Sequence, residues 1–304
     1  MKKITTAQAD LLLLSVAFIW GSTFIVVKNA LEGITPFAFN FIRFTIAFFF
    51  LYLLYRPGKK LFRKKILLAG ASIGFVLFLG YTLQTIGLKY TTAANAAFIT
   101  GLSVIMVPFL NIYFTKHFPQ PIVIVGALLA AIGLALLTLK NEFIIQTGDF
   151  LMLFCALCFA LHIVLIARYA THYNSTQLAI LQISVVALFS FFALILHPAE
   201  CWPTSFSKDV WIALALTAIP ATALALLVMN GVQKFTTASR TAIILATEPV
   251  FGALTAWSYG GEILTKLDLF GASLILLGIL LVELKNKQPK LSHEQVQKER
   301  KLEQ

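Results

Sequence analysis

The sequence predicts an all-α integral membrane protein with ten transmembrane helices, built as two inverted five-helix repeats. The first observation is composition: 59% of the 304 residues are hydrophobic and only 12% are charged, whereas soluble domains carry roughly 25% charged residues. The mean hydropathy is +0.86. The second is a series of apolar runs, each near the ~20 residues that a helix needs to cross a bilayer. The third is an internal duplication.

The expected spans follow one another with short connections. They cover residues 8–27, 36–55, 65–86, 94–114, 121–139, 148–168, 175–196, 210–230, 240–258 and 267–284. Runs such as Phe48 to Leu51 are unbroken, which excludes the alternating pattern of outer-membrane strands. The first run resembles a signal peptide, but nine further spans follow it, so we expect an uncleaved first helix. The charged segment 285–304 is expected to be a solvated tail.

Basic residues predict the orientation. Most of the 24 Lys and Arg residues fall on one side of the expected spans, and the other side carries only Lys28, Lys89, Lys140, Lys208 and Lys266. By the positive-inside rule the richer side is cytoplasmic, so we expect a cell (cytoplasmic or inner) membrane protein with both termini inside. The net charge of +11 is therefore explained by topology and contact with membrane lipids, and no nucleic-acid partner is expected.

The first half of the sequence aligns with the second when residue numbers are shifted by either of two constant offsets, and this reveals the duplication. At the first, Asp10 matches Asp149 and Arg43 falls on Gln182. At the second, residues 89–93 (KYTTA) match residues 234–238 (KFTTA), and two glycines, Gly126 and Gly133, match Gly271 and Gly278. The halves are 1–145 and 146–284. Because each holds five spans, the second half must be inverted in the membrane, and inverted repeats commonly place a substrate at their interface.

Several short segments together resemble a known family. They are Trp20-Gly21-Ser22-Thr23-Phe24, Phe41-Ile42-Arg43-Phe44, Gly148-Asp149, Glu248-Pro249-Val250 and Gly261-Glu262. With the duplicated five-helix unit, they are similar to EamA-type members of the drug/metabolite transporter superfamily over residues of about 8 to 284.

The resemblance implies a secondary transporter that moves a small molecule by alternating access. The cargo would be an amino acid, a related metabolite or a drug-like compound, and the direction would be export. Helices one to four and six to nine would line a central cavity, while the fifth and tenth would lie at the periphery and support a homodimer. The alternative class is a lipid-handling flippase or a membrane scaffold or sensor.

Two ionisable residues lie well inside the expected spans, where a charge is costly to insert. Glu248 either faces the cavity as a proton-accepting or cation-binding group or caps the helix break at Pro249. Arg43 either binds an anionic group of the substrate, pairs with Glu248, or satisfies backbone carbonyls near a helix end.

Uncharged polar and aromatic residues complete the candidate substrate site, since an unpaired polar group in a span needs a neighbour or a ligand. Each either lines the cavity or joins two helices. They are Trp20, Ser22, Asn40, Tyr81, Gln84, Asn95, Thr100, His162, Gln182 and Asn230. Trp20 is the expected aromatic wall, and His162 is a residue type that exchanges protons near neutral pH.

The sequence offers little for catalysis, so no enzyme is expected. Glu248 is the only convincing acid inside a span, and neither an H-x-x-x-H metal spacing nor a phosphate-binding glycine loop is present. No cofactor or metal is therefore expected. Cys155 and Cys158 form a C-x-x-C pair without a nearby basic group, which indicates packing residues.

Overall fold

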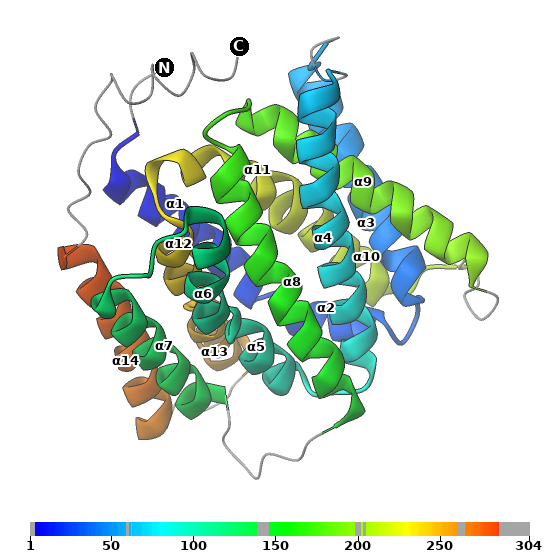
Figure 1. The fold of residues 1–304 in the computed structure, drawn as a ribbon. Coiled ribbons are helices and arrows are strands. Elements are labelled where there is room, and N and C mark those ends of the chain that lie inside the picture. Colours follow the sequence, from blue (N-terminus) through cyan, green and yellow to red (C-terminus); the bar gives the residue numbers. More distant parts are fainter. Residues whose placement is uncertain are drawn as a thin grey trace.

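The computed structural model describes residues 4–58, 61, 63–138, 146–197, 202, 205–260 and 265–285, and these form helices and no strand. The expected tail from 286 onward, Lys140 and Gly261-Glu262 lie outside this part of the chain. Figure 1 shows the helices of the first half: α1 (Thr6–Gly21), α2 (Phe24–Ala30), α3 (Pro36–Tyr55), α4 (Lys64–Lys89), α5 (Ala93–Gly101), α6 (Ser103–Thr115) and α7 (Pro121–Thr138).

The second half continues in the same way. It holds α8 (Thr147–Tyr169), α9 (Ser175–Leu196), α10 (Lys208–Ala218), the π-helical turn η2 (Ile219–Leu224), α11 (Ala225–Val232), the 3-10 turn η3 (Gln233–Phe235), α12 (Ala238–Leu245), α13 (Glu248–Gly260) and α14 (Lys266–Lys285).

Local sequence explains where the helices begin and end. The Thr5 side chain accepts from the backbone of Gln8 in a capping box at the start of α1, and Pro36 occupies the first turn of α3. The Asn174 side chain caps two free amides of α9. Arg56 adopts a left-handed conformation, with φ 42°, and ends α3.

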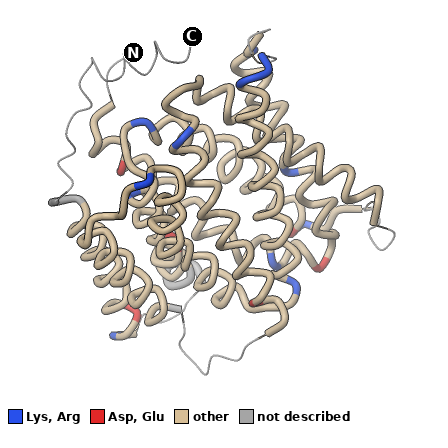
Figure 2. Tube along the Cα trace, viewed as in Figure 1, with Lys and Arg blue, Asp and Glu red and all other residues tan. Residues whose placement is uncertain are grey.

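Seven helical segments of the described chain are long and apolar enough to cross a membrane. They are Thr6–Ala30, Pro36–Tyr55, Lys64–Lys89, Ala93–Thr115, Thr147–Tyr169, Ser175–Leu196 and Lys208–Phe235. Pro121–Leu137 is apolar but shorter. Large apolar side chains such as Leu53 and Leu196 are 63% and 76% exposed, as expected of surfaces that face lipid. Charged residues lie mainly at helix ends (Figure 2).

Several of the expected continuous spans are interrupted. The first divides between Gly21 and Phe24, the fourth at Leu102, and the ninth at Ala246 and Thr247. The eighth runs through the π-helical turn η2, which contains Pro220. A proline cannot donate its i→i−4 hydrogen bond, so a local change of helix type at this position is expected.

Packing brings the two halves together along their length. Helix α4 packs against α8 and α9, α3 packs against α9, and α1 packs against α11, α12 and α13. A large apolar cluster contains residues from both halves, among them Leu13, Phe44, Ile73, Ile166 and Leu178. The interior between these helices therefore belongs to both halves.

The glycine faces of α7 and α14 pack against each other within the chain. A Cβ atom added at Gly126 would overlap the carbonyl of Gly278, and one added at Gly133 would overlap the carbonyl of Gly271. Small residues thus let the two backbones approach closely, as in other membrane helix pairs. On the outward faces of these helices Leu128 and Leu280 are about half exposed within the described part of the chain.

Candidate functional site

A cavity lies in the interior between the two halves. The cavity receives side chains from α1 to α6, α8, α11 and the α12–α13 connection. Its lining residues are Trp20, Thr23, Phe24, Val27, Arg43, Leu77, Tyr81, Gln84, Leu88, Thr100, Gly101, Ser103, Phe159, His162, Ile163, Met229, Leu245, Ala246 and Glu248.

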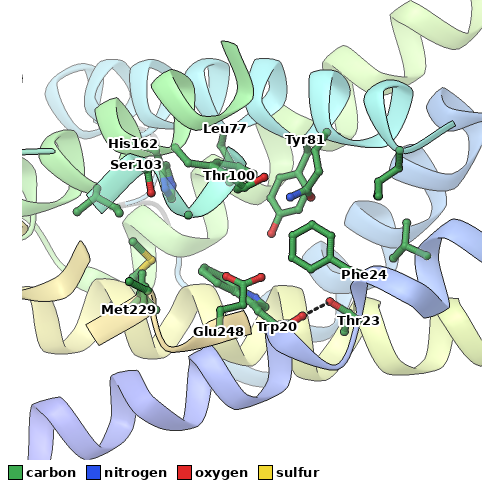
Figure 3. A pocket seen from close by; sticks show the side chains of 18 of the residues that line it. Trp20, Thr23, Phe24, Leu77, Tyr81, Thr100, Ser103, His162, Met229 and Glu248 are labelled. Carbon is green, nitrogen blue, oxygen red and sulfur yellow. Dashed lines mark hydrogen bonds between the residues drawn. The ribbon is translucent and has the colours of Figure 1, made fainter. Parts of the chain in front are cut away.

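Glu248 enters the cavity because the ninth span breaks directly before it. The chain leaves α12 at Ala246, the Thr247 hydroxyl donates back to the Ile244 carbonyl (2.7 Å), and Glu248 becomes the first residue of α13. Gly21 of α1 packs so closely on this turn that an added Cβ atom would overlap the Glu248 carbonyl. In Figure 3 the Glu248 carboxylate points into the space that Tyr81 enters from the opposite wall.

The Glu248 carboxylate has no hydrogen-bond or ion-pair partner among the residues that the structure describes. Its position in the first turn of α13 places it near the free amide groups of a helix start, which favours a negative charge. A carboxylate without a partner inside a membrane protein is costly unless a proton or a ligand neutralises it. The site is therefore suited to bind one or the other.

Arg43 has partners other than Glu248. Its Nε donates to the Thr222 hydroxyl in η2 at 2.6 Å, and its Cζ lies 4.7 Å from the centre of the Tyr81 ring. Only 4% of Arg43 is exposed. The expected pairing of Arg43 with Glu248 is therefore not made, because Thr222 and the aromatic face of Tyr81 hold the guanidinium instead. Its hydrogen-bond acceptor is a side-chain hydroxyl and not a backbone carbonyl.

Trp20 forms a fixed wall of the cavity. Its indole Nε1 donates to the carbonyl of Ala221 at 2.7 Å, which ties the end of α1 to the π-helical turn. The Thr23 hydroxyl donates back to the Trp20 carbonyl at 2.7 Å (Figure 3), where the first span is interrupted. The break between α1 and α2 thus places Trp20, Thr23 and Phe24 on the same cavity.

His162 lines the cavity from α8, and Gln182 supports it from α9. The His162 Nε2 and the Gln182 Oε1 are 2.7 Å apart, and the two residues are 2% and 0% exposed. Gln182 does not line the cavity itself. Its contact restricts the rotation of the His162 ring.

The structure places the expected substrate-binding residues in two groups. Those that line the cavity are Trp20, Arg43, Tyr81, Gln84, Thr100, His162 and Glu248. Those outside the lining are Ser22, Asn40, Asn95, Gln182 and Asn230. That the first group binds a substrate stays a prediction.

The residues outside the lining bond within their own helix or to another helix. Ser22 donates to the carbonyl of Ile19 at 3.0 Å, Asn230 donates to Leu226 at 2.7 Å, and Asn95 donates to Asp149 at 3.5 Å. Asn40 is fully buried, where its side chain accepts from Thr85 at 3.2 Å. The contacts of Asn40 and Asn95 join two helices, whereas those of Ser22 and Asn230 lie within one helix.

Sequence reasoning missed part of the site. Phe24, Phe159 and Met229 are lining residues that look like any other apolar residue of a span. Thr222 was missed as the partner of Arg43, although its place two residues after Pro220 marks an irregular stretch of helix. Among the described residues, no group of three or more His, Cys, Asp or Glu side chains could hold a metal ion.

Comparisons with known proteins agree on one family. Residues 7–139 and residues 146–284 each match the EamA-like transporter family. An uncharacterized transporter of Archaeoglobus fulgidus is 42% identical over 279 residues, which cover 91% of this chain and 86% of that protein. The uncharacterized transporter YyaM of Bacillus subtilis is 26% identical, with 89% and 92% of the two chains covered.

The fold also resembles a solved crystal structure. The TM-score is 0.76 at 19% sequence identity, and the match covers 91% of this chain and 97% of the other. At this identity the likeness concerns the fold alone.

Proposed function

The chain belongs to the EamA-like transporter family, and from this premise we propose that it is a secondary transporter that exports a small metabolite by alternating access at its central cavity. It is a multi-pass membrane protein, since many of its helices are apolar and its family and relatives are transporters. Membership of a transporter family implies transport and not catalysis.

One observation carries the proposal. A cavity lies between helices of both halves and is lined by Glu248, whose carboxylate has no partner among the described residues. Most of the other lining side chains are aromatic or aliphatic, and the polar ones are a few hydroxyls together with Arg43, Gln84 and His162. A mainly apolar pocket with a small number of polar groups is the usual form of a small-molecule site.

We propose ten spans in two inverted repeats, 1–145 and 146–284, followed by a cytoplasmic tail, 285–304. The breaks at Leu102 and at Thr247 support the repeat, because these positions correspond at the sequence offset that aligns residues 89–93 with 234–238. The Asp10 and Asp149 match supports it as well. An inverted repeat lets the same cavity face either side as the halves rock.

The chemistry of the cavity suggests a substrate with a positively charged amine. Arg43 already has Thr222 and Tyr81 as partners, whereas Glu248 has none among the described residues. An amine or a proton would neutralise Glu248, and exchange of one for the other would couple transport to a proton gradient. The rings of Trp20 and Phe24 would hold the apolar part of the substrate.

The charges and surfaces of the protein support a membrane, an orientation and an oligomeric state. We propose the cytoplasmic membrane with both termini inside, because the basic residues gather on one side of the expected spans. Membrane lipids cover the exposed apolar residues. A homodimer through the outward faces of α7 and α14 is part of the proposal, since their glycine faces are already used within the chain.

A lipid-handling flippase is the second candidate. An apolar groove opens outward between α3 and α9, lined by Phe41, Thr45, Phe48, Ser184, Ala187, Leu188 and Phe191. This groove shares no lining residue with the central cavity, so a lipid in it would not reach Glu248 directly. A fluorescent-lipid scrambling assay in the same vesicles separates the two candidates.

The test is transport by purified protein in proteoliposomes. Uptake and efflux of a panel of amines, amino acids and related metabolites would be measured with and without a pH gradient, for the wild type and for Glu248→Gln. We expect the variant to lose about tenfold or more of the transport rate, together with its dependence on the gradient, because an uncharged amide binds an ammonium group far less strongly.

The matched control is Glu32→Gln, which makes the same chemical change at an exposed position next to the end of α2. This control should transport like the wild type. Equal rates and equal pH dependence in Glu248→Gln and the wild type would show that Glu248 neither binds the substrate nor couples protons. Failure of the wild type to move any compound of the panel, together with lipid scrambling, would favour the flippase.

A further inference from the structure

Two aspartates join the halves of the chain, each through the start of another helix. Asp10, in α1, accepts from Arg240, in α12: the Nε to Oδ1 distance is 3.0 Å, and a second bond joins Nη2 to Oδ2. Asp149, in α8, accepts from the Thr91 hydroxyl and, at 3.5 Å, from the Asn95 amide. We call these the Asp10 contact and the Asp149 contact.

The two contacts are the same site built twice. Asp10 and Asp149 are equivalent in the duplication, and Arg240 falls on Asn95 at the offset that aligns residues 234–238 with 89–93. Thr92 and Thr237 cap their helices in the same way, since each accepts from the backbone amide three residues on, at 3.0 and 3.2 Å. In both cases an aspartate of one half bonds to the first turn of a helix of the other half.

The contacts lie at opposite ends of the helix bundle. Lys28, near the end of α2, donates to the Thr91 carbonyl at 2.6 Å and so lies beside the Asp149 contact. Asp10 lies near the start of the same span, and a helical rise of 1.5 Å per residue separates it from Lys28 by about 27 Å. Trp20 and Thr23, which line the cavity, lie between them in this span.

From this geometry we propose that the Asp10 and Asp149 contacts close the two ends of the cavity and break alternately during transport. The inference rests on the proposed function, because alternating access requires two closures of which one opens at a time. Both contacts are formed in this structure. Each crosses between the halves, so a rocking motion of one half against the other would stretch one contact and preserve the other.

The two closures differ in strength. Asp10 is paired with a guanidinium through two hydrogen bonds, a geometry that is among the strongest in proteins. Asp149 receives neutral donors, supported by a backbone bond from Gly148 to the Tyr90 carbonyl at 3.2 Å. The end that holds Asp149 should therefore open more readily than the end that holds Asp10.

The experiment measures access to the cavity from each side. A single reporter cysteine, Ser103→Cys, lines the cavity in a background that also carries Cys155→Ala, Cys158→Ala and Cys201→Ala. The full chain is labelled with a membrane-impermeant maleimide in right-side-out and in inverted vesicles. An N-terminal tag identifies the side on which Asp10 lies.

We expect Asp10→Asn to raise labelling from the N-terminal side roughly tenfold, because a charge-assisted bond is lost. Asp149→Asn should raise labelling from the other side by a smaller factor. Asn95→Arg, which gives Asp149 the partner that Asp10 has, should lower labelling from that other side. The control is Asp209→Asn, an exposed aspartate in the first turn of α10, which should leave both rates unchanged.

A second variant shows whether raised labelling comes from a folding defect or from the loss of a closure. Exchange of the pair, Asp10→Arg with Arg240→Asp, restores opposite charges at the same two positions and should recover the wild-type labelling of both sides. The inference is overturned by unchanged labelling in Asp10→Asn, by an equal rise from both sides, or by an exchanged pair that labels like Asp10→Asn.

The outcome also distinguishes this inference from the proposed function. The same wild-type preparation is assayed for transport of the metabolite panel. Transport without any sided change of labelling in Asp10→Asn and Asp149→Asn contradicts the two closures and leaves the transporter proposal standing. Sided changes of labelling without transport of any compound contradict the transporter proposal and leave the two contacts as closures of the cavity.

Discussion

At the residue scale, the two ionisable groups of the cavity differ in what surrounds them. Arg43 is held by the Thr222 hydroxyl and by the face of Tyr81. Glu248 has no partner among the described residues and faces open space. This difference assigns the two residues different roles: Arg43 connects α3 to the π-helical turn across the two halves, and Glu248 is free to bind a ligand or a proton.

Removal of the Thr222 hydroxyl tests the role of Arg43. In Thr222→Val the Arg43 Nε loses its acceptor inside the protein, and an unsatisfied buried donor costs about 1–3 kcal/mol. We therefore expect a lower free energy of unfolding by that amount, measured by thermal denaturation of the protein in detergent. Thr217→Val is the control, because the buried Thr217 hydroxyl bonds only to the Ala213 carbonyl of its own helix (2.6 Å).

Thr217→Val should cost clearly less than Thr222→Val, since its bond is confined to one helix and a neighbouring amide still occupies the carbonyl. Equal losses of stability in the two variants would mean that the bond from Arg43 to Thr222 stabilises the fold no more than a hydroxyl that bonds within its own helix.

At the element scale, breaks and close crossings of helices determine the shape of the cavity. The interruptions near Ser22, Leu102 and Thr247 all fall beside lining residues. Gly21 allows α1 to meet α13 directly at Glu248. The α7 and α14 pair crosses on its glycines and contributes no lining residue. The broken helices thus form the site together with the continuous helices α3, α4 and α8, and the α7 and α14 pair packs beside them.

The α7 and α14 crossing predicts the effect of an added methyl group. In Gly133→Ala the Cβ atom would overlap the backbone of Gly271 and the side chain of Ile275, so the helices must move apart. We expect destabilisation of about 1–3 kcal/mol, as for other overpacked positions, read as a lower thermal unfolding temperature in detergent. Gly231→Ala is the matched control, because an added Cβ atom there meets nothing within 4 Å.

Gly231→Ala should be neutral or more stable by up to about 1 kcal/mol, since alanine favours a helix more than glycine does. A Gly133→Ala protein as stable as Gly231→Ala would show that the two helices do not pack as closely as the structure places them.

At the scale of the whole molecule, the number of membrane crossings decides which side each end of the chain faces. The proposed even number of spans would put both termini on one side, and the bias of Lys and Arg predicts that this side is the cytoplasm. The two halves would then run in opposite directions, which the cavity between them requires if it is to face both compartments in turn.

Accessibility of terminal tags tests this topology. We expect short tags at the N and C termini both to resist protease in intact cells and both to be cleaved in inverted membrane vesicles, because the proposed topology places both ends in the cytoplasm. A tag placed in the connection between α9 and α10 should show the reverse pattern and serves as the internal control. Cleavage of only one terminal tag in intact cells would exclude an even number of spans.

The sequence by itself determined the class of protein and seven of the predicted apolar spans, and the duplicated segments are its prediction. These follow from properties that act locally or by repetition: the cost of unpaired backbone groups in lipid demands long apolar helices, and a duplication leaves matched residues such as Asp10 and Asp149. The sequence also singled out Glu248 and Arg43, because charged side chains are costly in a span, and Trp20, because it lies near the middle of a span and not at its interfacial end.

Only the tertiary structure decided which of the polar residues share the cavity. A span that is apolar on all sides carries no pattern that tells its interior face from its lipid face, so sequence could not separate Tyr81 and Thr100 from Asn40 and Asn230. Contacts between distant segments are equally hidden. The pairing of Asp10 with Arg240 joins residues 230 positions apart, because packing of the two halves, and not local sequence, brings those helix ends together.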